Sequence, residues 1–242
     1  MNRPPWRAAA LGLLVATGAA HAQGTPRPAG PAAATDPVRA SFQAALAPGL
    51  GDSTRVRLNR FLATYARHPL AKDAQYELGL LSYAEGDYAG ARAHFRRARP
   101  AQGGEEARYW EGLSAFALGD PRDARDAVLA VARSRRDVAR RWDSAYLVAL
   151  SWAEEGRRPE ALAAYRSLLA LPAGPGQAAA LYQAERLATE LTRDEDAAEW
   201  RNRLLRNYPR SPEAASVRAE TQALAPARPA AGKPATPAPV RH

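Results

Sequence analysis

The stretch YELGLLSYAEGDYAGARAHF, residues 76–95, decides the fold. Its first half places apolar residues at helical spacing, and Gly86 followed by Asp87 interrupts that pattern. Glycine can take the left-handed conformation that ends a helix, and aspartate can cap the helix that follows. The second half again has helical spacing, with Ala91 and Phe95 on one face. The stretch therefore predicts two short helices joined by a tight turn.

The same skeleton recurs along the chain. Four tyrosines are spaced by 33, 37 and 36 residues, an alanine follows each after fifteen residues, and a glycine follows the first three after ten. Thr192 stands where the fourth glycine would be. A repeat of this length is typical of a solenoid of helical hairpins, which is a binding surface. The tyrosines are Tyr76, Tyr109, Tyr146 and Tyr182, the alanines are Ala91, Ala124, Ala161 and Ala197, and the glycines are Gly86, Gly119 and Gly156.

Packing explains why residues of the same size recur at the same position of each repeat. The alanines are small because the two helices of a hairpin approach closely there, and Phe95 is large because it fills the hole beside the next hairpin. Val128 and Tyr165 match Phe95 in phase, whereas Arg201 stands at the fourth position. At the second turn, Asp120 before Pro121 predicts a capped helix start.

These residues resemble the tetratricopeptide repeat family. The best copy keeps eight family positions, and the resemblance spans roughly residues 36 to 220. It implies an all-α, right-handed superhelical solenoid of about five hairpins plus a terminal helix that begins at Ser211. The segment YPRSPEA, residues 208–214, is similar to a periplasmic subgroup that includes the outer-membrane assembly lipoprotein and the Tol–Pal-associated coordinator. The eight positions are Leu78, Gly79, Tyr83, Gly86, Tyr88, Ala91, Phe95 and Ala98.

The N-terminus has the features of a cleavable signal peptide. Arg3 and Arg7 precede an apolar stretch at 8–19, and Ala-His-Ala at 20–22 fits a cleavage site. Twelve helical residues rise only about 18 Å, so the stretch is too short to span a bilayer; an uncleaved anchor is the alternative. We expect a signal peptide at 1–22, a disordered Pro/Ala-rich linker at 23–35, the repeat domain at 36–222 and a disordered Pro/Ala-rich basic tail at 223–242.

Charge and cysteine content narrow the classes of function. The net charge is +9, but residues 36–223 carry 28 Lys and Arg against 25 Asp and Glu, so much of the excess lies in the flanks. The high charge is therefore no indication of a nucleic-acid surface. The chain has no cysteine, which excludes disulfides, cysteine-ligated metals and a lipid-anchoring cysteine. Together with the N-terminal pattern, this predicts a periplasmic protein without a lipid anchor. The tails are either solvated extensions or contacts to anionic envelope polymer.

The sequence carries no motif for chemistry. His68 and His94 have no histidine or cysteine at metal-ligand spacing, and there is no phosphate-binding glycine loop or nucleophile elbow. We therefore predict no catalytic residue, no metal ligand and no cofactor.

Two candidate interaction sites remain. The resemblance implies that the first helix of each hairpin lines a groove for a partner helix or an extended peptide; the alternative is that the tyrosines only pack hairpin on hairpin. A basic patch lies between the second and third copies; the alternative is a set of cations favoured at a helix end, followed by a solvated face. The groove set is Tyr76, Leu80, Tyr109, Leu113, Tyr146, Leu150 and Tyr182, and the patch is Arg133, Arg135, Arg136, Arg140 and Arg141.

The sequence thus predicts a non-catalytic periplasmic scaffold or adaptor that binds a protein or extended peptide during cell-envelope or outer-membrane biogenesis or maintenance. Two alternatives stay open: an accessory subunit of a peptidoglycan-modifying machine, and an unrecognised enzyme.

Overall fold

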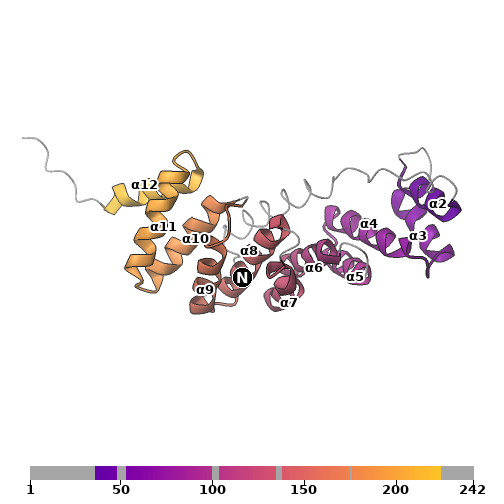
Figure 1. Ribbon diagram of the computed structural model, residues 1–242, viewed down its shortest axis with the longest axis horizontal. Helices are drawn as coiled ribbons and strands as arrows, with labels where there is room; N and C mark the ends of the chain where they lie inside the picture. The colour runs from indigo at the N-terminus through magenta and orange to yellow at the C-terminus, as the bar shows by residue number, and fades with distance from the viewer. Residues whose placement is uncertain (1–35, 48–52, 100–103, 135–137, 175, 225–242) are drawn as a thin grey trace, which may run out of the picture.

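The computed structural model describes residues 36–47, 53–99, 104–134, 138–174 and 176–224, and these residues form eleven helices and no strand. None of these helices is both long enough and apolar enough to cross a membrane. Figure 1 shows them following one another along an extended arc, with α2 at one end and α12 at the other. The helices are α2 (Pro37–Leu46), α3 (Thr54–Thr64), α4 (Leu70–Ala84), α5 (Tyr88–Ala98), α6 (Gly104–Leu118), α7 (Pro121–Ala132), α8 (Val138–Glu154), α9 (Arg158–Leu169), α10 (Gln177–Glu190), α11 (Asp194–Asn207) and α12 (Pro212–Leu224).

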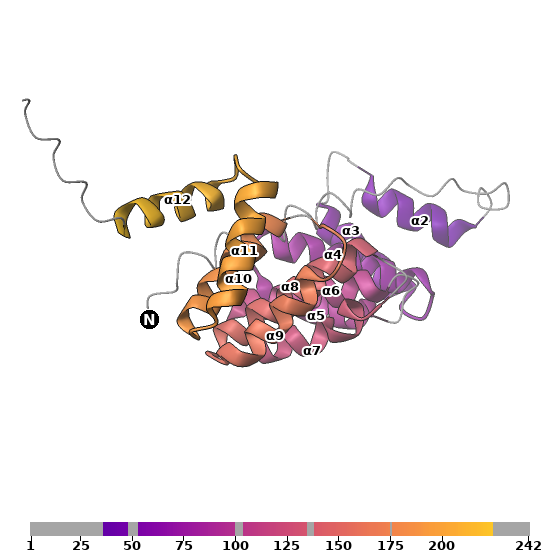
Figure 2. The ribbon, with the colours of Figure 1, turned by 60° about the vertical axis from the view of Figure 1, so that its left-hand side comes forward.

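The helices pair into five hairpins and leave α12 over, which confirms the predicted all-helical solenoid. Hairpin 1 is α2–α3, hairpin 2 is α4–α5, hairpin 3 is α6–α7, hairpin 4 is α8–α9 and hairpin 5 is α10–α11. In both views the second helices α5, α7 and α9 lie along one side of the arc (Figures 1 and 2). Each hairpin therefore packs against its neighbours in the chain, as expected of a solenoid.

The turns of hairpins 2 to 5 share one backbone conformation. Gly86, Gly119 and Gly156 have φ of 81°, 93° and 72°, and Thr192 takes the same left-handed conformation with φ of 54°. In every turn the residue after this position donates its N–H to a carbonyl five residues back, as Asp87 does to Ser82 at 2.9 Å and Arg193 does to Ala188 at 2.8 Å. The replacement of glycine by Thr192 in the fourth copy therefore changes the sequence but not the conformation of the turn.

Helix caps confirm most of the predicted starts. The side chain of Asp36 accepts the N–H of Val38 at 2.9 Å, that of Asp87 accepts the N–H of Gly90 at 2.9 Å, and that of Ser211 accepts the N–H of Ala214 at 3.1 Å. Asp120 is the N-cap residue and Pro121 the first residue of α7, as predicted, but the Asp120 side chain makes no capping hydrogen bond. Its carboxylate instead accepts a hydrogen bond from Arg92 of hairpin 2 at 2.8 Å.

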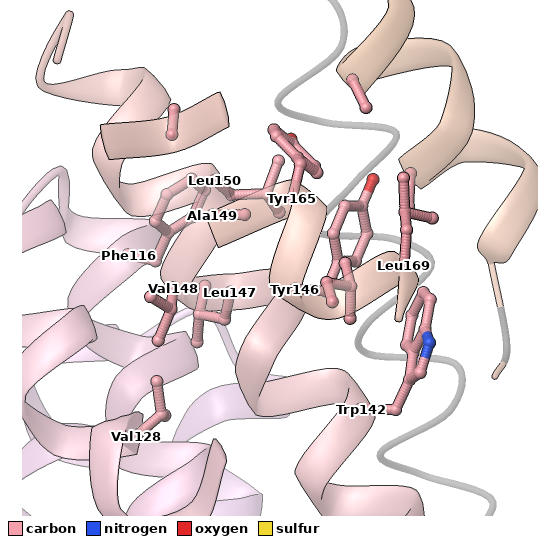
Figure 3. Packing of buried hydrophobic residues seen from close by; sticks show 14 of the residues in the cluster. Phe116, Val128, Trp142, Tyr146, Leu147, Val148, Ala149, Leu150, Tyr165 and Leu169 are labelled. Atoms are coloured by element: carbon pink, nitrogen blue, oxygen red, sulfur yellow. The ribbon is translucent and has the colours of Figure 1, made fainter. Parts of the chain in front are cut away.

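In hairpins 2 to 4 a small residue of the first helix stands opposite a larger residue of the second helix. Ala91, Ala124 and Ala161 are fully buried, as predicted. A Cβ on Gly79 would lie 2.6 Å from the Phe95 ring, and one on Gly112 would lie 2.4 Å from Val128, so the first helix needs a very small residue there. In hairpin 4 the same pair of positions is Ala149 and Tyr165, both buried; Figure 3 shows them with Tyr146, Trp142 and Leu169.

Hairpin 5 replaces this apolar pair by an ion pair. Glu185 stands at the position of Gly79, and Arg201 stands at the position of Phe95. The Glu185 side chain is 3% exposed and accepts the Arg201 Nε–H at 2.9 Å, whereas the Arg201 side chain is 44% exposed. Arg201, which replaces the aromatic residue in the fourth copy, therefore joins the two helices of hairpin 5 by an ion pair instead of an apolar contact.

A row of ion pairs, which we call the arginine ladder, ties each hairpin to the next. Its members are separated by 28 to 32 residues, so each joins consecutive hairpins. One pair spans each of the four junctions: Arg55–Glu85 at 2.6 Å, Arg92–Asp120 at 2.8 Å, Arg125–Glu155 at 2.7 Å and Arg158–Glu190 at 3.0 Å.

Candidate interaction surfaces

The tyrosine column lies partly inside the protein. Tyr109 is 0% and Tyr146 is 1% exposed, and Leu113 and Leu150 are fully buried as well. Burial leaves these four side chains without a surface that a partner could contact, so the prediction that they line an open groove is wrong. The alternative, that the tyrosines pack hairpin on hairpin, describes this middle part of the column.

The two ends of the column are different. Tyr76 and Tyr182 are half-buried, and Leu80 is partly buried against the core. The Tyr182 hydroxyl donates to Glu220 of α12 at 3.0 Å, and burial followed by the charge of Glu220 raises the pKa of this hydroxyl. Only the outer members of the predicted groove therefore reach the surface among the residues that the structure describes.

A polar cluster around Glu106 replaces part of the predicted basic patch. The Arg140 side chain is 0% exposed, pairs with Glu106, and contacts Asp143 at 3.2 Å. Its guanidinium carbon lies 4.4 Å from the centre of the Tyr109 ring. Glu106 also accepts the Trp110 indole N–H at 3.1 Å. Arg140 therefore stabilises the junction of hairpins 3 and 4, and its assignment to a docking patch is wrong.

The rest of the patch is divided. Arg133 is exposed at the end of α7, Arg141 is half-buried in α8, and Arg135 and Arg136 lie outside the described residues. The acidic residues that precede the tyrosines by three positions were the available signal for Arg140, because Glu106 and Asp143 both belong to that series. Arg140 therefore pairs with two carboxylates at the junction of hairpins 3 and 4, and its charge does not lie on a solvated face.

One open groove lies between α10 and α12. It has a volume of about 550 Å³ and is lined by Arg186, Thr189, Glu190, Val217 and Glu220, among others. The Arg186 guanidinium lies 5.9 Å from the Tyr182 ring, and Glu220 holds the Tyr182 hydroxyl, so this tyrosine borders the groove. An aromatic ring with charged neighbours at the edge of an apolar recess suits the binding of a protein segment.

A larger groove lies over α8 between the second helices α7 and α9. Its volume is about 880 Å³, and its apolar members include Leu129, Ala132, Ala145, Val148 and Trp152. Four arginines and three carboxylates surround them: Arg122, Arg125, Arg133, Arg157, Asp126, Glu155 and Glu160. Sequence reasoning missed this groove, because it took the first helices to be the binding side.

The described residues hold no cluster of three or more histidine, cysteine, aspartate or glutamate side chains that could bind a metal ion. Burial raises the pKa of both Asp73 and Glu77, which lie one turn apart on α4. Arg39 acts in the opposite direction on Asp73, while the charge of Asp73 raises the pKa of Glu77 further. Both carboxyl groups therefore take up a proton more readily than an exposed acid does.

Comparison with known proteins agrees with this architecture. A tetratricopeptide repeat model matches residues 58–106 and 109–178. The protein is a tetratricopeptide repeat protein. Members of this family bind protein or peptide partners and typically act as non-catalytic scaffolds. No curated protein matches the chain in sequence.

Solved structures share the fold of this tetratricopeptide repeat protein at low sequence identity. YrrB, described as a tetratricopeptide repeat protein with an unusual peptide-binding site, is 20% identical with a TM-score of 0.56 over 69% of this chain and 82% of its own. PilF of Pseudomonas aeruginosa is 19% identical with a TM-score of 0.54 over 89% and 100%. MamA is 18% identical with a TM-score of 0.53 over 69% and 90%.

Proposed function

We propose that the protein is an exported, non-catalytic adaptor of the cell envelope, which holds a segment of another protein in the groove between α10 and α12. The observation that carries the proposal is the groove itself: it is open, and Tyr182, one of the two half-buried ends of the tyrosine column, borders it. Tyrosine combines an apolar ring with a polar tip and is frequent among residues that dominate binding energy.

The N-terminal sequence supports the location. A positively charged start, an apolar stretch and Ala-His-Ala at 20–22 together favour export and cleavage. N-terminal sequencing of the envelope fraction should then begin at Gln23. An intact Met1 in that fraction would contradict export by this route, and it would leave the binding groove untouched as a hypothesis.

A photo-crosslinking amino acid tests the groove. Placed at Thr189, which is exposed and lines the groove, it should capture a defined protein band that mass spectrometry identifies. Tyr182→Ala should reduce that band strongly, with helical circular dichroism unchanged. Glu220→Ala, an exposed change at the same edge, should reduce it less.

The control places the same crosslinker at Ala198, an exposed position on α11. An equal band from both positions, or a band at Thr189 that Tyr182→Ala leaves intact, would show that this groove is not the binding site.

A further inference from the structure

We infer that the groove between α7 and α9 is a second docking surface, and that its occupant is an acidic amphipathic helix of another protein. This surface is built from the second helices and from the far side of α8, so it is separate from the α10–α12 groove. The inference does not rest on the function proposed above, and either can fail alone.

The shape of the groove favours a helix. Three helices supply its walls and floor, and small side chains line it at Ala132, Ala145, Ala163 and Ala164. Small residues let a further helix approach closely, and helices commonly bind in apolar grooves through side chains three or four residues apart. The volume of about 880 Å³ is large enough for several such side chains.

Trp152 is a preorganised anchor in this groove. The Arg125 guanidinium lies 3.5 Å from the centre of its ring and donates to Glu155 at 2.7 Å. The Arg157 guanidinium lies 4.5 Å from the same ring and pairs with Glu160. Two paired arginines thus hold an aromatic ring that is still partly exposed, which lowers the entropy lost when a partner packs on it.

The charge of the rim selects an acidic partner. Arg125 and Arg157 already have Glu155 and Glu160 as partners. Of the other charged side chains that line the groove, Arg122 and Arg133 are exposed near the two ends of α7, against Asp126 alone. The rim therefore carries an excess of positive charge, which attracts glutamate or aspartate and repels a basic segment such as the C-terminal tail, with its Arg228, Lys233 and Arg241.

Fluorescence anisotropy with the full-length protein and two synthetic peptides tests this inference. The first probe is a fluorescein-labelled peptide of about 18 residues, a length that sustains a helix, with leucines along one face and glutamates elsewhere. The second carries lysine in place of every glutamate. The glutamate probe should bind at least about tenfold more tightly than the lysine probe, and raising NaCl from about 50 mM to about 300 mM should weaken it several-fold.

Variants locate the bound probe. Ala163 is exposed and lines the groove, so Ala163→Glu places a negative charge there without disturbing the core, and we expect about tenfold weaker binding of the glutamate probe. Arg122→Glu with Arg133→Glu should weaken it at least as much. Ala198→Glu matches Ala163→Glu, and Arg206→Glu reverses one arginine charge; both lie at exposed positions of α11 and should leave binding unchanged.

Several results would overturn the inference: no binding of the glutamate probe, equal binding of the lysine probe, or binding that both groove variants leave intact. Loss of binding with Tyr182→Ala alone would assign the peptide to the α10–α12 groove instead. A dimer in sedimentation equilibrium that Ala163→Glu breaks would give this surface to a second copy of the chain.

Discussion

Hairpins 4 and 5 have one architecture and two chemistries. In hairpin 4 the turn residue is Gly156, and the buried residues Ala149 and Tyr165 stand at the positions that Gly79 and Phe95 occupy in hairpin 2. In hairpin 5 the turn residue is Thr192, and the helices meet through the ion pair of Glu185 and Arg201. The backbone turn is the same in both. The comparison teaches that the repeat is a set of geometric positions, which several kinds of side chain can satisfy.

The largest effect should come from breaking the ion pair on its exposed side. Arg201→Met removes the partner of the buried Glu185 carboxylate and leaves that charge uncompensated, which we expect to lower the free energy of unfolding by about 3 kcal/mol. Glu185→Ala should cost less, because the Arg201 side chain is 44% exposed and keeps its hydration. Urea unfolding followed by circular dichroism measures both. Equal losses would show that burial does not govern this pair.

Overpacking tests the apolar side of the comparison. Ala91 is fully buried where the helices of hairpin 2 meet, so Ala91→Leu should destabilise the protein by roughly 1–3 kcal/mol. Leu80 is only partly buried, so Leu80→Ala should cost less than the roughly 2–5 kcal/mol of a core leucine, and less than Ala91→Leu. The reverse order in thermal melts would show that the helix faces are assigned incorrectly.

Exchanging the turn residues should change stability by about 1 kcal/mol in opposite directions. Thr192→Gly removes the steric cost of a side chain at φ of 54° and should raise the melting temperature. Gly156→Thr introduces that cost at φ of 72°, where no atom crowds an added Cβ, so its effect reports on backbone conformation alone. A destabilising Thr192→Gly would mean that the threonine side chain contributes a contact that outweighs the strain.

The smallest effect should come from converting one chemistry into the other. Glu185→Ala combined with Arg201→Tyr copies the pair of hairpin 4 into hairpin 5. Because apolar replacement of an ion pair is often neutral, we expect a free energy of unfolding within about 1 kcal/mol of the natural protein. A loss as large as that of Arg201→Met would show that the surroundings of hairpin 5, and not only the two positions, require the charges.

Periodicity in the sequence was enough to predict the hairpins, their turns and the buried alanines. Each of those features depends on spacing, and spacing is visible in a sequence. The side of the helix that a partner can reach depends on neighbouring hairpins instead: Tyr109 and Tyr146 occupy the same phase as Tyr182, but only the middle tyrosines are covered on both sides. Arg140 looked like one member of a surface cluster, because it stands in a run of arginines and one of its two carboxylate partners, Glu106, is 34 residues away. The groove over Trp152 depends on three helices at once, so no single motif indicates it.

The arginine ladder makes the stiffness of the molecule uneven along its length. Its ion pairs cross the four junctions between hairpins, which are the joints of the solenoid. Dissolved salt screens an exposed ion pair more strongly than a buried one. At the Arg55–Glu85, Arg92–Asp120 and Arg158–Glu190 joints the side chains are 28% to 59% exposed, whereas those of Arg125 and Glu155 are 9% and 22% exposed. Rising ionic strength should therefore loosen these three joints before the Arg125–Glu155 joint. The Arg125–Glu155 joint lies beside Trp152, so the groove between α7 and α9 should keep its form while the other joints loosen.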